Sequence, residues 1–157
     1  MKTLVLCSLV LFCACGPGGA APLDGSLTAV MDVAYDRATL EATDGYLSLR
    51  FLKKRGEVED TVLKVGVIID GKVPDHSVQF DLAEAMSGGQ RGTATRNVLE
   101  DPDHTVFPRL SRGLFRADGD LTKAKTVQGE VSLTFVQGNE TASGRAVFGT
   151  FQAELVR

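Results

Sequence analysis

The chain has no tryptophan, only two tyrosines, and no cysteine after its fifteenth residue. Surfaces that stack on sugars use tryptophan and tyrosine, so this composition argues against a carbohydrate-binding platform. The three cysteines are Cys7, Cys13 and Cys15, whereas a small domain held by disulfides would carry an even set in its body. The body must therefore fold around its own core, which a hydrophobic content of 43% can supply.

Basic charge is also scarce. The 157 residues include 17 Lys and Arg against 20 Asp and Glu, which gives a net charge of −3 at pH 7. Nucleic-acid binding needs a clustered basic face, and anionic lipid attracts polybasic segments; the sequence shows neither. We expect no nucleic-acid partner, and we expect membrane attachment to be covalent or through another protein.

The first 22 residues carry the most specific pattern in the chain. Lys2 supplies a positive charge, residues 3–12 form an apolar run, and small residues and cysteines follow at once. This run is too short for a bilayer core, which needs roughly 20 residues. A positive start, a short apolar run and small residues at its end are typical of a cleaved export signal.

The sequence Leu-Phe-Cys-Ala-Cys at the end of this run resembles the signal of bacterial lipoproteins, in which a small residue precedes the lipidated cysteine. Ala14 fits the small position before Cys15. Cys13 as the acceptor would place bulky Phe12 at that position, so the resemblance implies lipidation at Cys15. The alternatives are an ordinary secretory signal cut after Ala21 and an uncleaved anchor.

The lipoprotein resemblance divides the chain into three parts. They are a signal peptide (residues 1–14), a lipidated Cys15 with a tether rich in glycine and proline (residues 15–22), and a single β-domain (residues 23–157). Membrane attachment would run through the acyl chains on Cys15, each methylene of which contributes about 0.8 kcal/mol when buried. Gly16 is not the aspartate associated with inner-membrane retention, so the resemblance implies a cell-envelope location, in the outer membrane if the host is Gram-negative.

Beyond the tether, apolar residues recur with a period of two, which is typical of half-buried strands. The predicted strands cover residues 27–35, 38–42, 47–52, 63–69, 78–82, 131–135 and 147–155. We predict an all-β fold, an antiparallel sandwich or barrel of about seven to nine strands. Residues 83–120 show no sustained period and are predicted as an irregular middle segment with short elements, including one helical turn near residues 82–86.

The end of the chain carries a second resemblance. The sequence Gly-Glu-Val-Ser-Leu-Thr-Phe from Gly129, a glycine-containing turn, and Gly-Thr-Phe-Gln-Ala-Glu-Leu from Gly149 are similar to the closing hairpin of small uncharacterised β-rich lipoproteins of myxobacteria. The similarity covers about 25 residues, and the family offers no catalytic residues to transfer.

Two Pro-Asp-His triplets contain the only two histidines. If their loops met, His76, His104, Asp75 and Asp103 would provide imidazole and carboxylate ligands suited to zinc or a similar ion. The alternative is that Pro-Asp marks two turns with solvent-exposed histidines, because no diagnostic spacing links residues 28 positions apart.

No other motif points to a cofactor or to catalysis. Asp118, Gly119 and Asp120 lack the remaining ligands of a calcium loop, and no serine lies in a nucleophile elbow. We therefore expect no cofactor, and we interpret the chain as a non-enzymatic structural or interaction domain of the envelope, with an unknown envelope protein as partner. The alternatives are a metal-binding protein or metal-dependent hydrolase using His76 and His104, and a β-barrel that binds a small ligand.

Overall fold

β-Strands make up nearly all the regular structure in the computed structural model, which describes residues 21–157. In chain order the elements are η1, a 3-10 turn (Ser26–Ala29), β1 (Arg37–Thr43), β2 (Tyr46–Arg55), β3 (Val58–Ile68), β4 (Val78–Asp81), β5 (Ala85–Met86), β6 (Gly89–Gln90), β7 (Gly92–Asn97), β8 (Leu110–Asp118), β9 (Thr126–Phe135) and β10 (Ala146–Val156). The predicted all-β class is confirmed. Among the described residues, no helix has the length and apolar character needed to cross a bilayer.

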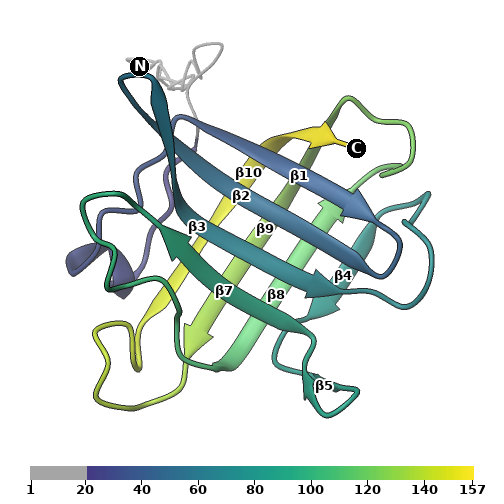
Figure 1. The fold of residues 1–157 in the computed structure, drawn as a ribbon. Helices are drawn as coiled ribbons and strands as arrows, with labels where there is room; N and C mark the ends of the chain where they lie inside the picture. The colour runs from purple at the N-terminus through teal and green to yellow at the C-terminus, as the bar shows by residue number, and fades with distance from the viewer. Residues whose placement is uncertain (1–20) are drawn as a thin grey trace, which may run out of the picture.

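Eight of these strands form one sheet in the order β4-β8-β9-β10-β1-β2-β3-β7, within the predicted range of seven to nine strands. In Figure 1 the strands β1, β2, β3 and β7 cross in front of β8, β9 and β10, so that the sheet curls into a barrel that is nearly closed. The remaining two strands, β5 and β6, pair as a small separate hairpin.

The pairing of β1 with β10 is parallel, with Ala38 opposite Ala153. Every other pair in the described sheet is antiparallel, so the expectation of a purely antiparallel sheet fails at this one seam. Parallel neighbours that follow one another in sequence need a long crossover connection. β1 and β10 are the first and last strands that the structure describes, so they can pair in parallel without such a connection.

β9 shows most clearly how the sequence builds the sheet. Val127, Gly129, Val131, Leu133 and Phe135 are buried, while the residues that alternate with them are less buried or exposed. This alternation places one apolar face of the strand toward the interior. Three rings from separate strands meet there: the centroid of Phe151 lies 6.4 Å from that of Phe51 and 6.0 Å from that of Phe115. The middle of the barrel is therefore a packed aromatic core.

Leu82, which follows β4, closes the gap between the two ends of the sheet. Its N–H donates to the carbonyl of Gly113 in β8 at 2.9 Å, and its carbonyl accepts from the N–H of Gly92 in β7 at 2.8 Å. A Cβ atom on Gly92 or Gly113 would lie only 2.5 or 2.7 Å from the Cβ of Leu82. Glycine at both positions thus makes room for the closing residue.

Several predicted elements differ from the structure. Residues 27–35 form η1 and an irregular segment rather than a strand. The isolated bridge to β10 lies before them, between Asp24 and Phe148, and the carbonyl of Asp32 accepts from the side chain of Arg96 rather than from a neighbouring strand. The predicted helical turn at residues 82–86 is replaced by the closing residue and the β5–β6 hairpin. The middle segment also contains two well-formed strands, β7 and β8, which the sequence indicated only in part.

Candidate functional site

Three irregular segments of the domain lie at one end of the barrel, on the left and lower left of Figure 1. We call this the loop end. It comprises the 98–109 loop between β7 and β8, the 136–145 loop between β9 and β10, and the 30–36 segment that leads into β1. Loops carried on a rigid scaffold commonly hold binding residues, so this end is the candidate functional site.

Arg96, on β7, anchors the loop end from inside the barrel. Its guanidinium donates to the carbonyl of Asp32 at 2.7 Å and to that of Val62 at 3.2 Å, and its Nε lies 3.5 Å from a carboxylate oxygen of Asp101. The side chain is only 5% exposed. One buried cation therefore joins β3, the 30–36 segment and the 98–109 loop.

The position of Val62 explains why a guanidinium is needed here. Val62 is the extra residue of a β-bulge, because it has no paired residue opposite it in β2 or in β7. A bulged residue leaves its backbone groups without ladder partners. Arg96 supplies the donor that this buried carbonyl would otherwise lack.

Asp60, on β3, is the second buried charge at this end, with 3% exposure. One of its carboxylate oxygens accepts from the N–H of Leu99 at 3.0 Å, and the other lies 2.5 Å from Nε of Arg55. The same arginine also pairs with Glu100. The start of the 98–109 loop is therefore held at three consecutive residues, 99 to 101, by side chains from the barrel.

His104 links this loop to its neighbour. Its Nδ1 contacts a carboxylate oxygen of Asp101, and its Nε2 lies 3.4 Å from the hydroxyl of Thr141 in the 136–145 loop. On the same loop, Arg145 donates to the carbonyls of Thr141, at 2.9 Å, and of Ser26, at 3.3 Å. All three parts of the loop end are thus cross-connected by polar contacts.

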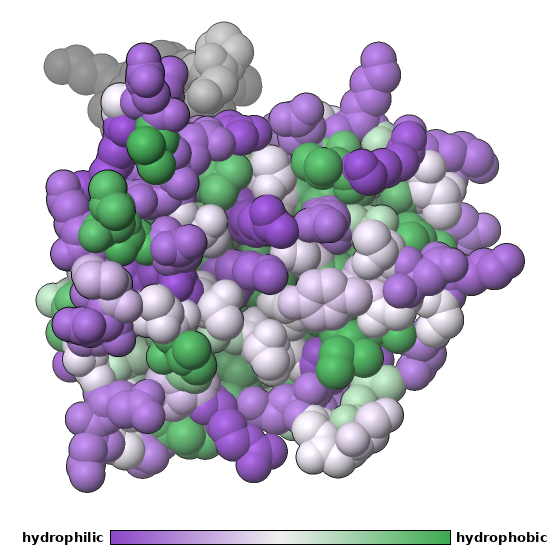
Figure 2. Space-filling model, in the orientation of Figure 1, coloured by the Kyte–Doolittle hydropathy of each residue, from purple (hydrophilic) through white to green (hydrophobic). Residues whose placement is uncertain are grey.

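The loop end nevertheless exposes large apolar side chains. Leu99 is 75% exposed and Val106 is 74% exposed, and Val58 at the β2–β3 hairpin is also exposed. Figure 2 shows hydrophobic side chains interrupting the polar surface over the β2–β3 hairpin and the loop that follows β7. Single exposed aliphatic residues are common. Two of them on one loop held by several ion pairs mark a fixed apolar surface.

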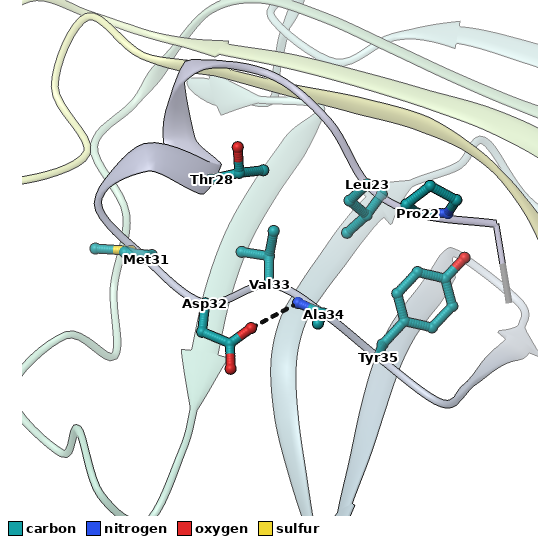
Figure 3. Close-up of a pocket in the computed structure, with 8 residues that line it drawn as sticks. All are labelled: Pro22, Leu23, Thr28, Met31, Asp32, Val33, Ala34 and Tyr35. Atoms are coloured by element: carbon teal, nitrogen blue, oxygen red, sulfur yellow. Dashed lines mark hydrogen bonds between the residues drawn. The ribbon is translucent and has the colours of Figure 1, made fainter.

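Two hollows open at this end and share Met31 as a wall. The first, of about 390 Å³, is lined by residues of the segment 22–35. Figure 3 shows this segment turning back on itself, so that Pro22 lies beside Tyr35. The ring of Tyr35 packs edge-on against Phe51 at 4.8 Å, and burial raises the pKa of its hydroxyl. The first hollow lies where the segment predicted as a tether joins the domain.

Among the described residues that line the first hollow, the one carboxylate is already engaged. Asp32 accepts from Nζ of Lys53 at 2.6 Å and from the N–H of Ala34 at 3.0 Å. The hydrogen bond from Lys53, followed by that from Ala34, lowers the pKa of Asp32 below its usual value. This hollow therefore offers an apolar wall beside a neutralised charge.

The second hollow, of about 360 Å³, lies between the 98–109 and 136–145 loops. Its apolar wall includes Met31, Val106 and Phe107. Asp103 and Glu140 also line it, one from each loop. Within residues 21–157, neither carboxylate takes part in an ion pair or a side-chain hydrogen bond. The carboxylate in the first hollow is thus paired with a lysine, whereas the two carboxylates in the second hollow are unpaired within the described residues.

The predicted metal ligands do not come together. His76 lies next to Asp75, with Nδ1 2.9 Å from the carboxylate, beside the strand end where Val78 pairs with Ala117. His104 lies near the opposite end of β8, and nine residues of strand span about 30 Å. In the part of the chain that the structure describes, no three His, Cys, Asp or Glu residues form a group that could hold a metal. The hydrogen bond from His76 lowers the pKa of Asp75.

The remaining candidates have ordinary structural surroundings. Arg116, on β8, pairs with Asp118 and Glu130 on the outer face of the sheet. Asp120 accepts from the N–H of Thr122 at 2.8 Å, which is turn geometry. Cys15 lies outside the described residues.

Sequence reasoning missed Arg96 and Asp60, although a signal was present. Ala94 and Arg96 share the inward phase of β7, because exposed residues alternate with them. An arginine in the inward phase of a strand predicts a buried charge that needs a partner. Comparisons of this chain with protein-family models, with curated proteins and with solved structures found no match.

Proposed function

We propose that this chain is an envelope lipoprotein, anchored through Cys15, whose β-domain is a non-enzymatic interaction module that binds a partner through its loop end. The observation that carries the proposed role of the domain is the fixed apolar surface there. Leu99 and Val106 are exposed on a loop that Arg96 and Asp60 hold from within the barrel. A preorganised loop loses little conformational entropy when it binds, which favours recognition.

The anchor is supported by the sequence before the domain. The order of Ala14, Cys15 and Gly16 resembles a lipoprotein processing site, and Pro22 follows Cys15 by seven positions. Fully extended, seven residues span at most about 25 Å. A lipidated Cys15 would therefore keep the domain close to the bilayer surface, in the outer membrane where the host is Gram-negative. Pro22 lines the first hollow, so the second hollow is the one further from the tether.

Growth of expressing cells with radiolabelled palmitate tests the anchor. The wild-type chain and the matched control Cys13→Ser are expected to incorporate label, whereas Cys15→Ser is expected to lose it. Label that persists in Cys15→Ser, or that is absent from the wild type, would contradict the proposed attachment. Fractionation of the same cells then shows whether the labelled protein lies with the envelope.

A further inference from the structure

We propose that the second hollow binds a peptide segment of the partner in which a Lys or Arg is flanked by apolar residues. This inference rests on the proposed role as an interaction module but is independent of the lipid anchor. The hollow combines an apolar wall, formed by Met31, Val106 and Phe107, with the two carboxylates of Asp103 and Glu140. An occupant that matches both features is apolar in part and positively charged in part.

The state of the carboxylates supports a cationic occupant. Neither Asp103 nor Glu140 has a partner in an ion pair within residues 21–157, whereas Asp32 in the first hollow is paired with Lys53. Among the residues that the structure describes, no Lys or Arg lines the second hollow. The nearby Arg145 is directed to the carbonyls of Thr141 and Ser26. A cation placed between the two loops would therefore meet carboxylates that are not already neutralised, and complementary charge of this kind steers specific association.

The apolar part of the hollow supports a peptide rather than a small cation alone. Val106 is 74% exposed and continues the wall outward, so an occupant must cover both the hollow and its rim. A volume of about 360 Å³ is at the lower end of the range for ligand pockets, roughly 300–1,000 Å³, and accommodates a few side chains. The acidic rim also disfavours an anionic lipid surface.

The walls of the hollow are held in place before binding. Asp101 joins the buried Arg96 to His104, and His104 contacts Thr141 on the facing loop. These contacts fix the separation of the two loops that carry Asp103 and Glu140. The recognition surface is therefore preorganised, which reduces the entropic cost of binding a flexible peptide.

The experiment begins with selection of a random dodecapeptide phage library on the full-length chain in detergent. Enriched peptides are expected to carry Lys or Arg beside apolar residues. One enriched peptide, synthesised with a fluorophore, is then titrated against the wild type and the Asp103→Asn, Glu140→Gln double variant. Two exposed charge contacts of about 0.2–1 kcal/mol each correspond to affinity about 2-fold to 30-fold weaker. The affinity is also expected to fall as salt is raised from 0.1 M to 1 M.

Two further variants separate charge from apolar contact and from general acidity. Val106→Thr keeps the shape of an exposed side chain and is expected to weaken binding severalfold. Glu57→Gln, which removes an exposed carboxylate at the β2–β3 turn, is expected to leave binding unchanged. Enriched peptides that bind the double variant as tightly as the wild type, through another part of the loop end, would overturn this inference but leave the proposed function standing. A selection without any enriched peptide would overturn both.

Discussion

Replacement of Arg96 by methionine tests the structural basis of the loop end. Methionine keeps most of the aliphatic length of the side chain but removes the donors to the carbonyls of Asp32 and Val62 and the charge opposite Asp101. Hydrogen bonds that involve a charged group contribute about 1.5–3 kcal/mol each, and breaking a buried ion pair costs about 3–5 kcal/mol. Asp101 is 32% exposed and the desolvation cost of the guanidinium disappears, so we expect a net loss of about 2–4 kcal/mol.

Urea denaturation followed by circular dichroism measures this loss. With a slope of about 2 kcal/mol per molar urea, the midpoint of Arg96→Met is expected to fall by about 1–2 M. The matched control is Arg109→Met, at an exposed side chain just before β8, for which we expect a change in stability within about 0.5 kcal/mol. Hydrogen exchange should also show faster exchange at the N–H of Leu99, because the loop is released. An unchanged or raised midpoint for Arg96→Met would refute the reasoning.

Two further changes test the barrel closure and the first hollow. Gly92→Ala places a Cβ 2.5 Å from that of Leu82, so we expect urea denaturation to show a loss of about 1–3 kcal/mol in the free energy of unfolding. Gly89→Ala is the control, because the nearest atom to its Cβ would be 3.9 Å away, and it should change stability little. Equal effects of the two substitutions would contradict the role of Leu82 in closing the barrel. The folded-state pKa of Asp32 is lowered, so its stabilising effect is present above its unfolded pKa of about 3.9 and is lost as the pH falls through the lower folded value. Asp32→Asn should therefore be less stable than the wild type at pH 6, by at most about 1 kcal/mol for this exposed pair. The two urea midpoints should converge as the pH falls through the lowered pKa of Asp32, and a gap that does not shrink on acidification would contradict the role of Lys53.

The parts of the fold that were predictable from sequence are those governed by local alternation. The strands around Leu49, Val65 and Val131 follow a two-residue period, and their pairing partners are close in sequence. The parallel seam between β1 and β10 was not predictable, because no local pattern specifies which distant strands become neighbours. The segment around Met31 alternates like a strand, yet it lies at the loop end, where Met31 and Val33 are buried without forming a strand ladder.

The candidate site was less predictable than the fold. The polar residues that drew attention in the sequence, His76 and Asp75, lie in an exposed turn at the end of the barrel opposite His104. The inward phase of β7 could have marked Arg96, but the backbone groups that hydrogen-bond to Arg96 and Asp60 could not be named from the sequence. Those of Arg96 lie 64 and 34 residues away, and that of Asp60 lies 39 residues away. Contacts over such separations depend on the register of three strands, which composition and spacing do not determine.

The claim that the loop end recognises a partner is tested most directly by photo-crosslinking in cells that express the full-length chain. A photoreactive amino acid replaces Val106 at the second hollow or, as a control, Gln128 on the exposed surface of β9. We predict a discrete crosslinked product from position 106 alone, which is lost in the Asp103→Asn, Glu140→Gln background and which mass spectrometry maps to a basic and apolar segment. Equal products from both positions, or a product from position 106 that persists without the two carboxylates, would contradict the account.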